Sequence, residues 1–196
     1  MIGIIGRIND NRITFNKEII DIINEYDNTP LGIIVDFNNN YEKEFNKIKP
    51  LIDMCDKIIL QGGNECYKID LLIAKYLYDK NIPTLGICLG MQTMALAFNG
   101  IEEKINNHQS KNKYVHNVII DKKSKLYEII KNDNILVNSR HNYCIKQTNL
   151  DICGKNDVIE AIEDKNKKFY IGLQWHPESL DDEVSNNIFD YFFSLK

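Results

Sequence analysis

Hydrophobic residues follow two alternating patterns in the first half of the chain. Short continuous apolar runs occupy residues 2–5, 32–37, 57–61 and 83–88. Runs of this kind are typical of strands that are buried on both faces of a sheet. Residues 14–25 and 66–79 carry apolar side chains at helical spacing, which predicts two amphipathic helices. Strands that alternate with helices predict an α/β three-layer sandwich with a mostly parallel central sheet.

The second half of the chain has shorter connections between its apolar segments. Strands are predicted at residues 114–121, 134–138, 157–163 and 168–174. The polar turn 164–167 joins the last two strands, which predicts an antiparallel hairpin, and residues 182–195 predict a final amphipathic helix. The sequence has no internal repeat, and its one low-complexity run is the asparagine triplet 38–40. These patterns predict a single domain over residues 1–196.

Composition and charge exclude several classes of protein. The net charge is −4, and lysines are interspersed with acidic residues, so the chain lacks the basic patch of a nucleic-acid-binding protein. No window approaches the roughly 20 apolar residues of a membrane span, and the first residues lack the basic region of a secretory signal. We therefore expect a cytoplasmic protein without a nucleic-acid or membrane partner. The five cysteines, an odd number without a CxxC pair, argue against a disulfide framework or a zinc knuckle.

One cysteine has a distinctive setting. Cys88 lies in the stretch GICLGMQ, at the carboxyl end of a predicted strand and directly before a helical pattern. The G-x-C-x-G arrangement resembles a nucleophile elbow, in which small neighbours allow a strained turn to expose the nucleophile. The amino end of the following helix would favour the thiolate. By itself, the same pattern fits a buried packing cysteine equally well.

A thiolate nucleophile needs a histidine to move protons, and the chain has four. His176 lies in QWHPE, directly after a predicted strand, and Glu178 follows two residues later on the same side of an extended segment. Glu178 can therefore orient His176, which predicts a Cys-His-Glu relay. His141 follows a strand and can line a cleft. The other two histidines flank a polar stretch, which predicts surface or loop positions; these are His108 and His116.

These motifs carry a family resemblance. The segments GICLGMQ, QWHPE and LQGGN resemble the class I glutamine amidotransferase family. Together with VNSRHNY, VIEAIE and FYIGLQWHPE, they are similar to its branch of stand-alone γ-glutamyl hydrolases, the γ-glutamyl-γ-aminobutyrate hydrolase type (peptidase C26). The chain departs from the usual pattern at residues 62–65 and 140–143. These departures predict an altered pocket for the leaving amine.

The resemblance implies a mechanism and a set of site residues. It implies that Cys88 cleaves a γ-glutamyl amide through a thioester, with His176 and Glu178 completing the catalytic triad and with no metal or cofactor. The backbone N–H groups of Gly63 and Leu89 are expected to form the oxyanion hole. The remaining matched positions are expected to bind substrate, and they are Gly62, Asn64, Gln92, Asn138, Ser139, Arg140 and His141.

The arginines suggest which chemical group the leaving amine carries. The chain has only three, Arg7, Arg12 and Arg140, and arginine prefers bidentate contact with phosphate or carboxylate. Arg7 and Arg140 could bind an anionic leaving group, although solvated surface positions explain them equally well. Within the branch, the chain is similar to enzymes that cleave γ-glutamyl-CDP-amidate. That similarity implies release of glutamate and cytidine diphosphoramidate for capsular polysaccharide modification.

Two other functional classes compete with the stand-alone hydrolase. The chain can be the glutaminase subunit of a two-protein amidotransferase, which passes ammonia to a synthetase partner. It can also be a non-enzymatic α/β binding module with a decayed triad. The presence of all three residues Cys88, His176 and Glu178 disfavours the last class.

Overall fold

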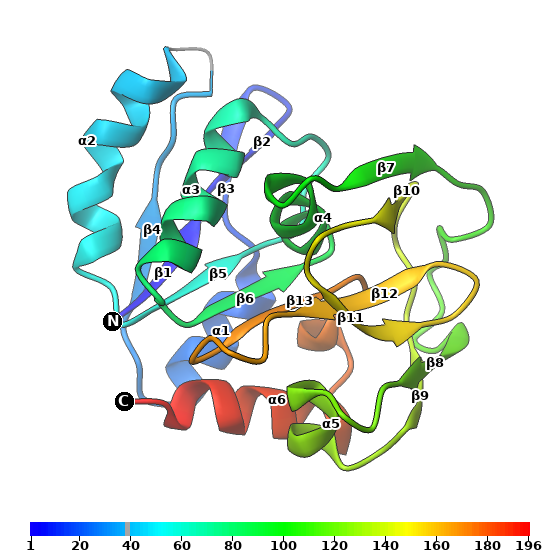
Figure 1. The fold of residues 1–196 in the computed structure, drawn as a ribbon. Helices are drawn as coiled ribbons and strands as arrows, with labels where there is room; N and C mark the ends of the chain where they lie inside the picture. The colour runs from blue at the N-terminus through cyan, green and yellow to red at the C-terminus, as the bar shows by residue number, and fades with distance from the viewer. Residues whose placement is uncertain (38–39) are drawn as a thin grey trace.

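The computed structural model describes residues 1–37 and 40–196, and its centre is a large twisted sheet (Figure 1). Five neighbouring strands of this sheet run parallel. In sheet order they are β4 (Pro30–Ile33), β1 (Ile2–Ile5), β5 (Lys57–Leu60), β6 (Thr84–Ile87) and β13 (Tyr170–Leu173). Their carboxyl ends share one edge, which is where open α/β sheets bind ligands.

The remainder of the sheet is antiparallel. Beyond β13 it continues in the order β12 (Ile159–Glu163), β11 (Asp151–Lys155), β8 (His116–Ile120) and β9 (Asn134–Val137). Strand β12 also pairs with β10 (Tyr143–Gln147), which in turn pairs with β7 (Ile101–Lys104). The antiparallel pairing of β12 with β13 confirms the hairpin predicted through residues 164–167.

Helices cover both faces of the sheet, which confirms the three-layer fold (Figure 1). One face packs against α1 (Lys17–Glu25), α5 (Lys125–Ile130) and α6 (Glu183–Ser194). The other packs against α2 (Tyr41–Asp53), α3 (Lys68–Asp79) and α4 (Leu89–Ala97). The central strands are therefore buried on both sides, which explains their continuous apolar runs. None of the helices in the described ranges is both long enough and apolar enough to cross a membrane.

The structure differs from the sequence expectations near the amino end. The predicted helix 14–25 begins only at Lys17, because β2 (Arg7–Asn9) and β3 (Arg12–Thr14) form a hairpin. The side chain of Asn16 then caps α1 by accepting a hydrogen bond from the Glu18 N–H. The strand predicted at 32–37 ends early, at Ile33, where its pairing with β1 stops. In the asparagine triplet 38–40, residues 38–39 lie outside the described part of the chain.

Candidate active site

Cys88 occupies the sharp turn between β6 and α4. Its backbone has φ 52° and ψ −106°, a conformation that side-chain-bearing residues rarely adopt and that is typically found where function demands it. The flanking glycines allow the close packing of this turn. A Cβ atom on Gly90 would lie 1.9 Å from the Leu60 carbonyl oxygen, and one on Gly86 would lie 2.4 Å from the sulfur of Met94. Both glycines are therefore needed for the turn that presents the thiol.

Two backbone N–H groups lie beside this turn. Leu89 is the first residue of α4, so its N–H has no acceptor within the helix. Gly63 follows β5 and packs on Leu89, since a Cβ atom on Gly63 would lie 2.9 Å from Leu89 Cδ2. The predicted oxyanion donors are thus neighbours at the carboxyl edge of the sheet. Their role remains a prediction.

His176 reaches Cys88 because β13, which precedes it, pairs with β6. A Cβ atom on Gly62 would lie 3.0 Å from His176 Cε1 and 3.7 Å from Cys88 Cβ, so Gly62 packs against both residues. The Nδ1 atom of His176 lies 2.7 Å from Glu178 Oε1. Burial alone would lower the pKa of His176, but hydrogen bonds with Cys88 and Glu178 outweigh it and raise this pKa to about 10. The imidazolium form is therefore stabilised at neutral pH.

Two asparagines hold this pair in place. Asn138 donates from Nδ2 to the His176 carbonyl oxygen at 2.7 Å, and its Oδ1 accepts from the His176 N–H at 2.8 Å. Asn16 donates to Glu178 Oε1 at 3.2 Å. Asn138 and Ser139 were expected to bind substrate, but both are fully buried. Asn138 orients the histidine loop instead, and the Ser139 hydroxyl donates to the His108 carbonyl oxygen.

A cavity of about 90 Å³ opens beside Cys88. Its lining includes four of the eight positions expected to bind substrate, together with residues to which no role was assigned. The lining residues are Gly63, Asn64, Cys88, Gln92, Gln109, Arg140, His141, Asn142 and Tyr143. The structure therefore gathers segments that lie far apart in the sequence around the thiol.

Gln174 is a site residue that the sequence analysis missed. Its Nε2 lies 3.7 Å from Cys88 Sγ, and its Oε1 accepts a hydrogen bond from Gln92 Nε2 at 3.2 Å. Gln92 also donates to the Tyr143 carbonyl oxygen at 2.9 Å, so its buried side chain links two sides of the site. The signal was present in the motif QWHPE, because Gln174 precedes His176 by two residues and extended residues at that spacing share a side.

The two arginines expected at the leaving group take different positions. Arg7 is buried, and its Nη1 pairs with Asp70 Oδ1 at 2.6 Å. Its side chain packs beneath Gly63, outside the cavity that contains Cys88. This placement does not match the predicted contact with a leaving group; Arg7 supports the Gly63 loop instead. Arg140 does line the cavity, and it donates from Nη1 to Ser179 Oγ at 3.0 Å.

An open hollow of about 500 Å³ adjoins the Cys88 cavity. Its lining residues are Gln109, Ser110, Lys111 and Arg140. Gln109 and Arg140 line both spaces, so the hollow continues from the cavity. Its two cationic side chains make it a favourable site for an anion.

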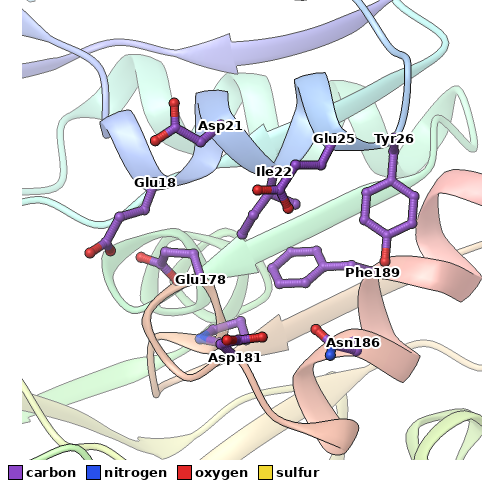
Figure 2. A pocket seen from close by; sticks show the side chains of 10 residues that line it. Glu18, Asp21, Ile22, Glu25, Tyr26, Glu178, Asp181, Asn186 and Phe189 are labelled. Atoms are coloured by element: carbon purple, nitrogen blue, oxygen red, sulfur yellow. The ribbon is translucent and has the colours of Figure 1, made fainter.

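A separate cavity of about 350 Å³ lies between α1 and α6, and Figure 2 shows its lining. Its carboxylates are Glu18, Asp21, Glu25, Glu178 and Asp181. Cys88 does not line this cavity. The negative charge of the cavity carboxylates would repel a glutamate-like ligand. Glu178 lines this space and also contacts His176.

The raised pKa of His176 predicts a pH dependence of stability. A histidine whose pKa rises on folding, here from 6.5 to about 10, contributes stability that is fully present below pH 6.5 and is lost as the pH rises through 10. Glu178→Gln should remove much of this contribution. Urea unfolding at a series of pH values should therefore show a free-energy difference between the wild type and Glu178→Gln that shrinks between pH 6.5 and 10. A constant difference would contradict the coupling.

Comparison with known proteins identifies the family to which the chain belongs. Residues 8–195 match the family described as glutamine amidotransferase class-I. A glutamine amidotransferase-like protein of Rickettsia prowazekii (strain Madrid E) is 27% identical in an alignment 209 residues long, and the match covers 69% of this chain and 74% of that protein. The CTP synthase of Bacteroides fragilis (strain YCH46) is 33% identical in an alignment 143 residues long, and the match covers 54% of this chain and 27% of the synthase.

A solved structure agrees with the fold. The glutaminase domain of Trypanosoma brucei CTPS, determined with bound acivicin, superimposes on this chain with a TM-score of 0.73 and 17% identity. The match covers 100% of this chain and 94% of that domain. At this level of identity the likeness concerns the α/β three-layer architecture.

Proposed function

Because the chain belongs to the class-I glutamine amidotransferase family, whose domains are cysteine-dependent amidohydrolases, we propose that it hydrolyses a γ-glutamyl amide with Cys88 as the nucleophile. The observation that carries this proposal is the strained turn at Cys88 beside an imidazole that hydrogen bonds to a buried glutamate at 2.7 Å. A thiolate next to an imidazolium is the reactive form of such a pair.

The first half of the reaction forms a thioester. The thiolate sulfur of Cys88 attacks the γ-carbonyl carbon, and the negative charge moves to the carbonyl oxygen, beside the N–H groups of Gly63 and Leu89. His176 then donates the proton on Nε2 to the amide nitrogen, the C–N bond breaks, and the amine leaves. Glu178 accepts from Nδ1–H throughout and keeps Nε2 directed at the reacting atoms.

The second half releases glutamate. His176 is now neutral and takes a proton from a water molecule, whose oxygen attacks the thioester carbon. The C–S bond breaks, glutamate leaves, and the thiolate and imidazolium return. The triad supplies every proton transfer, so the cleavage itself requires no metal ion.

The hollow beside the cavity supports an anionic leaving group. Arg140 and Lys111 line it, and it adjoins the space next to Cys88. A phosphate-bearing amine would place its negative charge there while its γ-glutamyl part reaches the thiol. We therefore propose γ-glutamyl-CDP-amidate as the substrate, with glutamate and cytidine diphosphoramidate as products for capsular polysaccharide modification.

The test is glutamate release by the purified protein with four substrates: glutamine, γ-glutamyl-γ-aminobutyrate, a γ-glutamyl dipeptide and γ-glutamyl-CDP-amidate. We expect the highest kcat/KM with γ-glutamyl-CDP-amidate and no release by Cys88→Ala. A preference for an uncharged leaving group would contradict the substrate proposal while preserving the hydrolase.

Removal of the Arg140 charge should mainly weaken substrate binding. For Arg140→Gln we expect KM for γ-glutamyl-CDP-amidate to rise about tenfold, because the variant loses one charge-assisted hydrogen bond to the substrate. The KM for a neutral γ-glutamyl amide should change little. Arg12→Gln is the matched control, because Arg12 is exposed in β3. Equal KM values for Arg140→Gln and the wild type would remove Arg140 from the leaving-group site.

Similarity to the CTP synthase favours a second candidate function. The matched region covers only 27% of that synthase, so this chain is similar to only one part of the synthase. The second candidate is a glutaminase subunit that passes ammonia to a synthetase partner. Weak activity on all four substrates, with glutamine hydrolysis stimulated by a co-purified synthetase, would favour it over the stand-alone hydrolase.

A further inference from the structure

Three metal-ligating side chains meet behind the wall of the catalytic cavity. His108 lies between β7 and β8, His116 begins β8, and Glu160 lies on β12. Each offers one ligand atom, and these atoms all lie within 4.8 Å of one another. The histidine rings are 5.3 Å apart between centroids. Both histidines were expected in surface or loop positions; in the structure they are half-buried and lie beside a buried carboxylate.

The carboxylate of Glu160 lacks the partners that a buried charge requires. Its side chain is fully buried, and within the described residues neither oxygen accepts a hydrogen bond. The His116 Nε2 atom lies 3.4 Å from Glu160 Oε1. Buried polar groups are nearly always paired, so an unpaired glutamate indicates a missing ligand.

The histidines present the atoms that a metal ion binds. The Ser139 hydroxyl donates its proton to the His108 carbonyl oxygen, so its oxygen can accept from His108 Nδ1–H at 3.2 Å. His116 Nδ1 faces the Asn117 carbonyl oxygen at 3.4 Å. With Nδ1 protonated, the Nε2 atom of each ring carries a lone pair. A metal-binding histidine usually donates a hydrogen bond from its other ring nitrogen to an oxygen atom, as both rings do here.

His141 adds a fourth nitrogen beside this group. Its ring centroid lies 4.9 Å from that of His108, and its Nδ1 lies 3.0 Å from the Tyr143 carbonyl oxygen. Its Nε2 is buried and has no hydrogen-bond partner among the described residues. An imidazole nitrogen without a hydrogen-bond partner is available to bind a cation.

We propose that His108, His116 and Glu160 bind a divalent zinc-type ion, with His141 Nε2 next to the remaining coordination position. Two or three imidazoles with one carboxylate suit zinc, whereas magnesium and calcium prefer oxygen ligands. The ion lies outside the triad and takes no part in the cleavage. It links the loop before β8 to the central sheet.

This link reaches the substrate cavity. The His108 carbonyl oxygen accepts from the His141 N–H at 2.9 Å, and Gln109 forms an isolated β-bridge with Arg140. His141, Gln109 and Arg140 all line the space beside Cys88. The ion therefore holds the wall of the cavity in the position that the substrate meets.

The test is a Co²⁺ titration of the Cys88→Ala protein after removal of metal by a chelator. Cobalt replaces zinc and absorbs visible light, and the Cys88→Ala background excludes binding at the catalytic thiol. We expect one equivalent to bind, with the visible bands of nitrogen and oxygen ligands and no thiolate charge-transfer band. Glu160→Gln and His108→Ala should each weaken binding about 100-fold or more, because each removes a direct ligand. Glu103→Gln, an exposed glutamate on β7, should bind as tightly as the parent.

Three outcomes would overturn the site: no binding to the parent protein, a thiolate band, or equal affinity in both ligand variants. Circular dichroism shows whether Glu160→Gln is folded. If Glu160→Gln is unfolded, the affinity of His108→Ala tests the site. His108 lies in a loop between β7 and β8, so its replacement should leave the fold intact. The titration measures metal binding without turnover, so its result is independent of the proposed hydrolase activity.

Discussion

Replacement of Cys88 by alanine should lower kcat for γ-glutamyl amides by on the order of 10⁵-fold, because no other group can form the thioester. The fold should persist. The turn at Cys88 is anchored by its backbone, since the Cys88 N–H donates to the Leu173 carbonyl oxygen at 2.8 Å and its carbonyl oxygen accepts from the Gln92 N–H at 3.1 Å. Alanine retains both hydrogen bonds.

Glutamate release and thermal unfolding of the purified variant check this expectation. Cys66→Ala is the matched control, because Cys66 is half-buried outside the cavity and should not be needed for turnover. Activity of Cys88→Ala close to that of the wild type would show that Cys88 is not the nucleophile. Cys88→Gly should unfold at a higher temperature than Cys88→Ala, since glycine relieves the positive φ of 52° and so gains about 1 kcal/mol.

Glu178→Gln should produce the second-largest loss, a fall in kcat of about 10³-fold with little change in KM. Glutamine has nearly the same shape as glutamate but cannot stabilise the imidazolium, and its amide can donate to Nδ1 and so favour the wrong tautomer. The pKa of His176 should fall toward its ordinary value, because the hydrogen bond and charge of Glu178 help to raise it.

Steady-state kinetics across a pH range measure both effects. The limb of the kcat/KM profile that reports His176 should move to lower pH in Glu178→Gln. Glu25→Gln is the control, since Glu25 lines the same acidic cavity and has no contact with His176. If both variants lose the same activity, the general negative charge of the cavity supports catalysis. That result would contradict a specific catalytic role for the hydrogen bond between Glu178 and His176.

Strands with a distinctive local pattern were predictable. Strands β1, β5 and β6 lie within one residue of the apolar runs that predicted them, because a strand buried on both faces must be apolar throughout. Helix α2 was not predicted. Its core-facing positions include Glu44 as well as Ile48 and Ile52, and it contains Pro50, so the apolar periodicity is weak.

The triad was predictable for a related reason. Cys88 and the pair His176 and Glu178 each belong to a short motif at the end of a predicted strand, and the carboxyl ends of parallel strands share one edge. Local sequence therefore predicted that these three residues meet at one edge of the sheet. The roles of Arg7 and Asn138 were not predictable in this way, because each depends on a partner far along the chain.

The fold class, the cysteine turn after β6 and the histidine–glutamate pair after β13 were all predicted from patterns within a few residues. Only the tertiary structure paired Arg7 with Asp70, directed Asn138 at the backbone of His176, and joined His108 and His116 to Glu160. The physical reason is that hydrophobic periodicity specifies which residues are buried. The order and register of the strands decide which buried residues meet, and neighbouring residues in the sequence do not encode that choice.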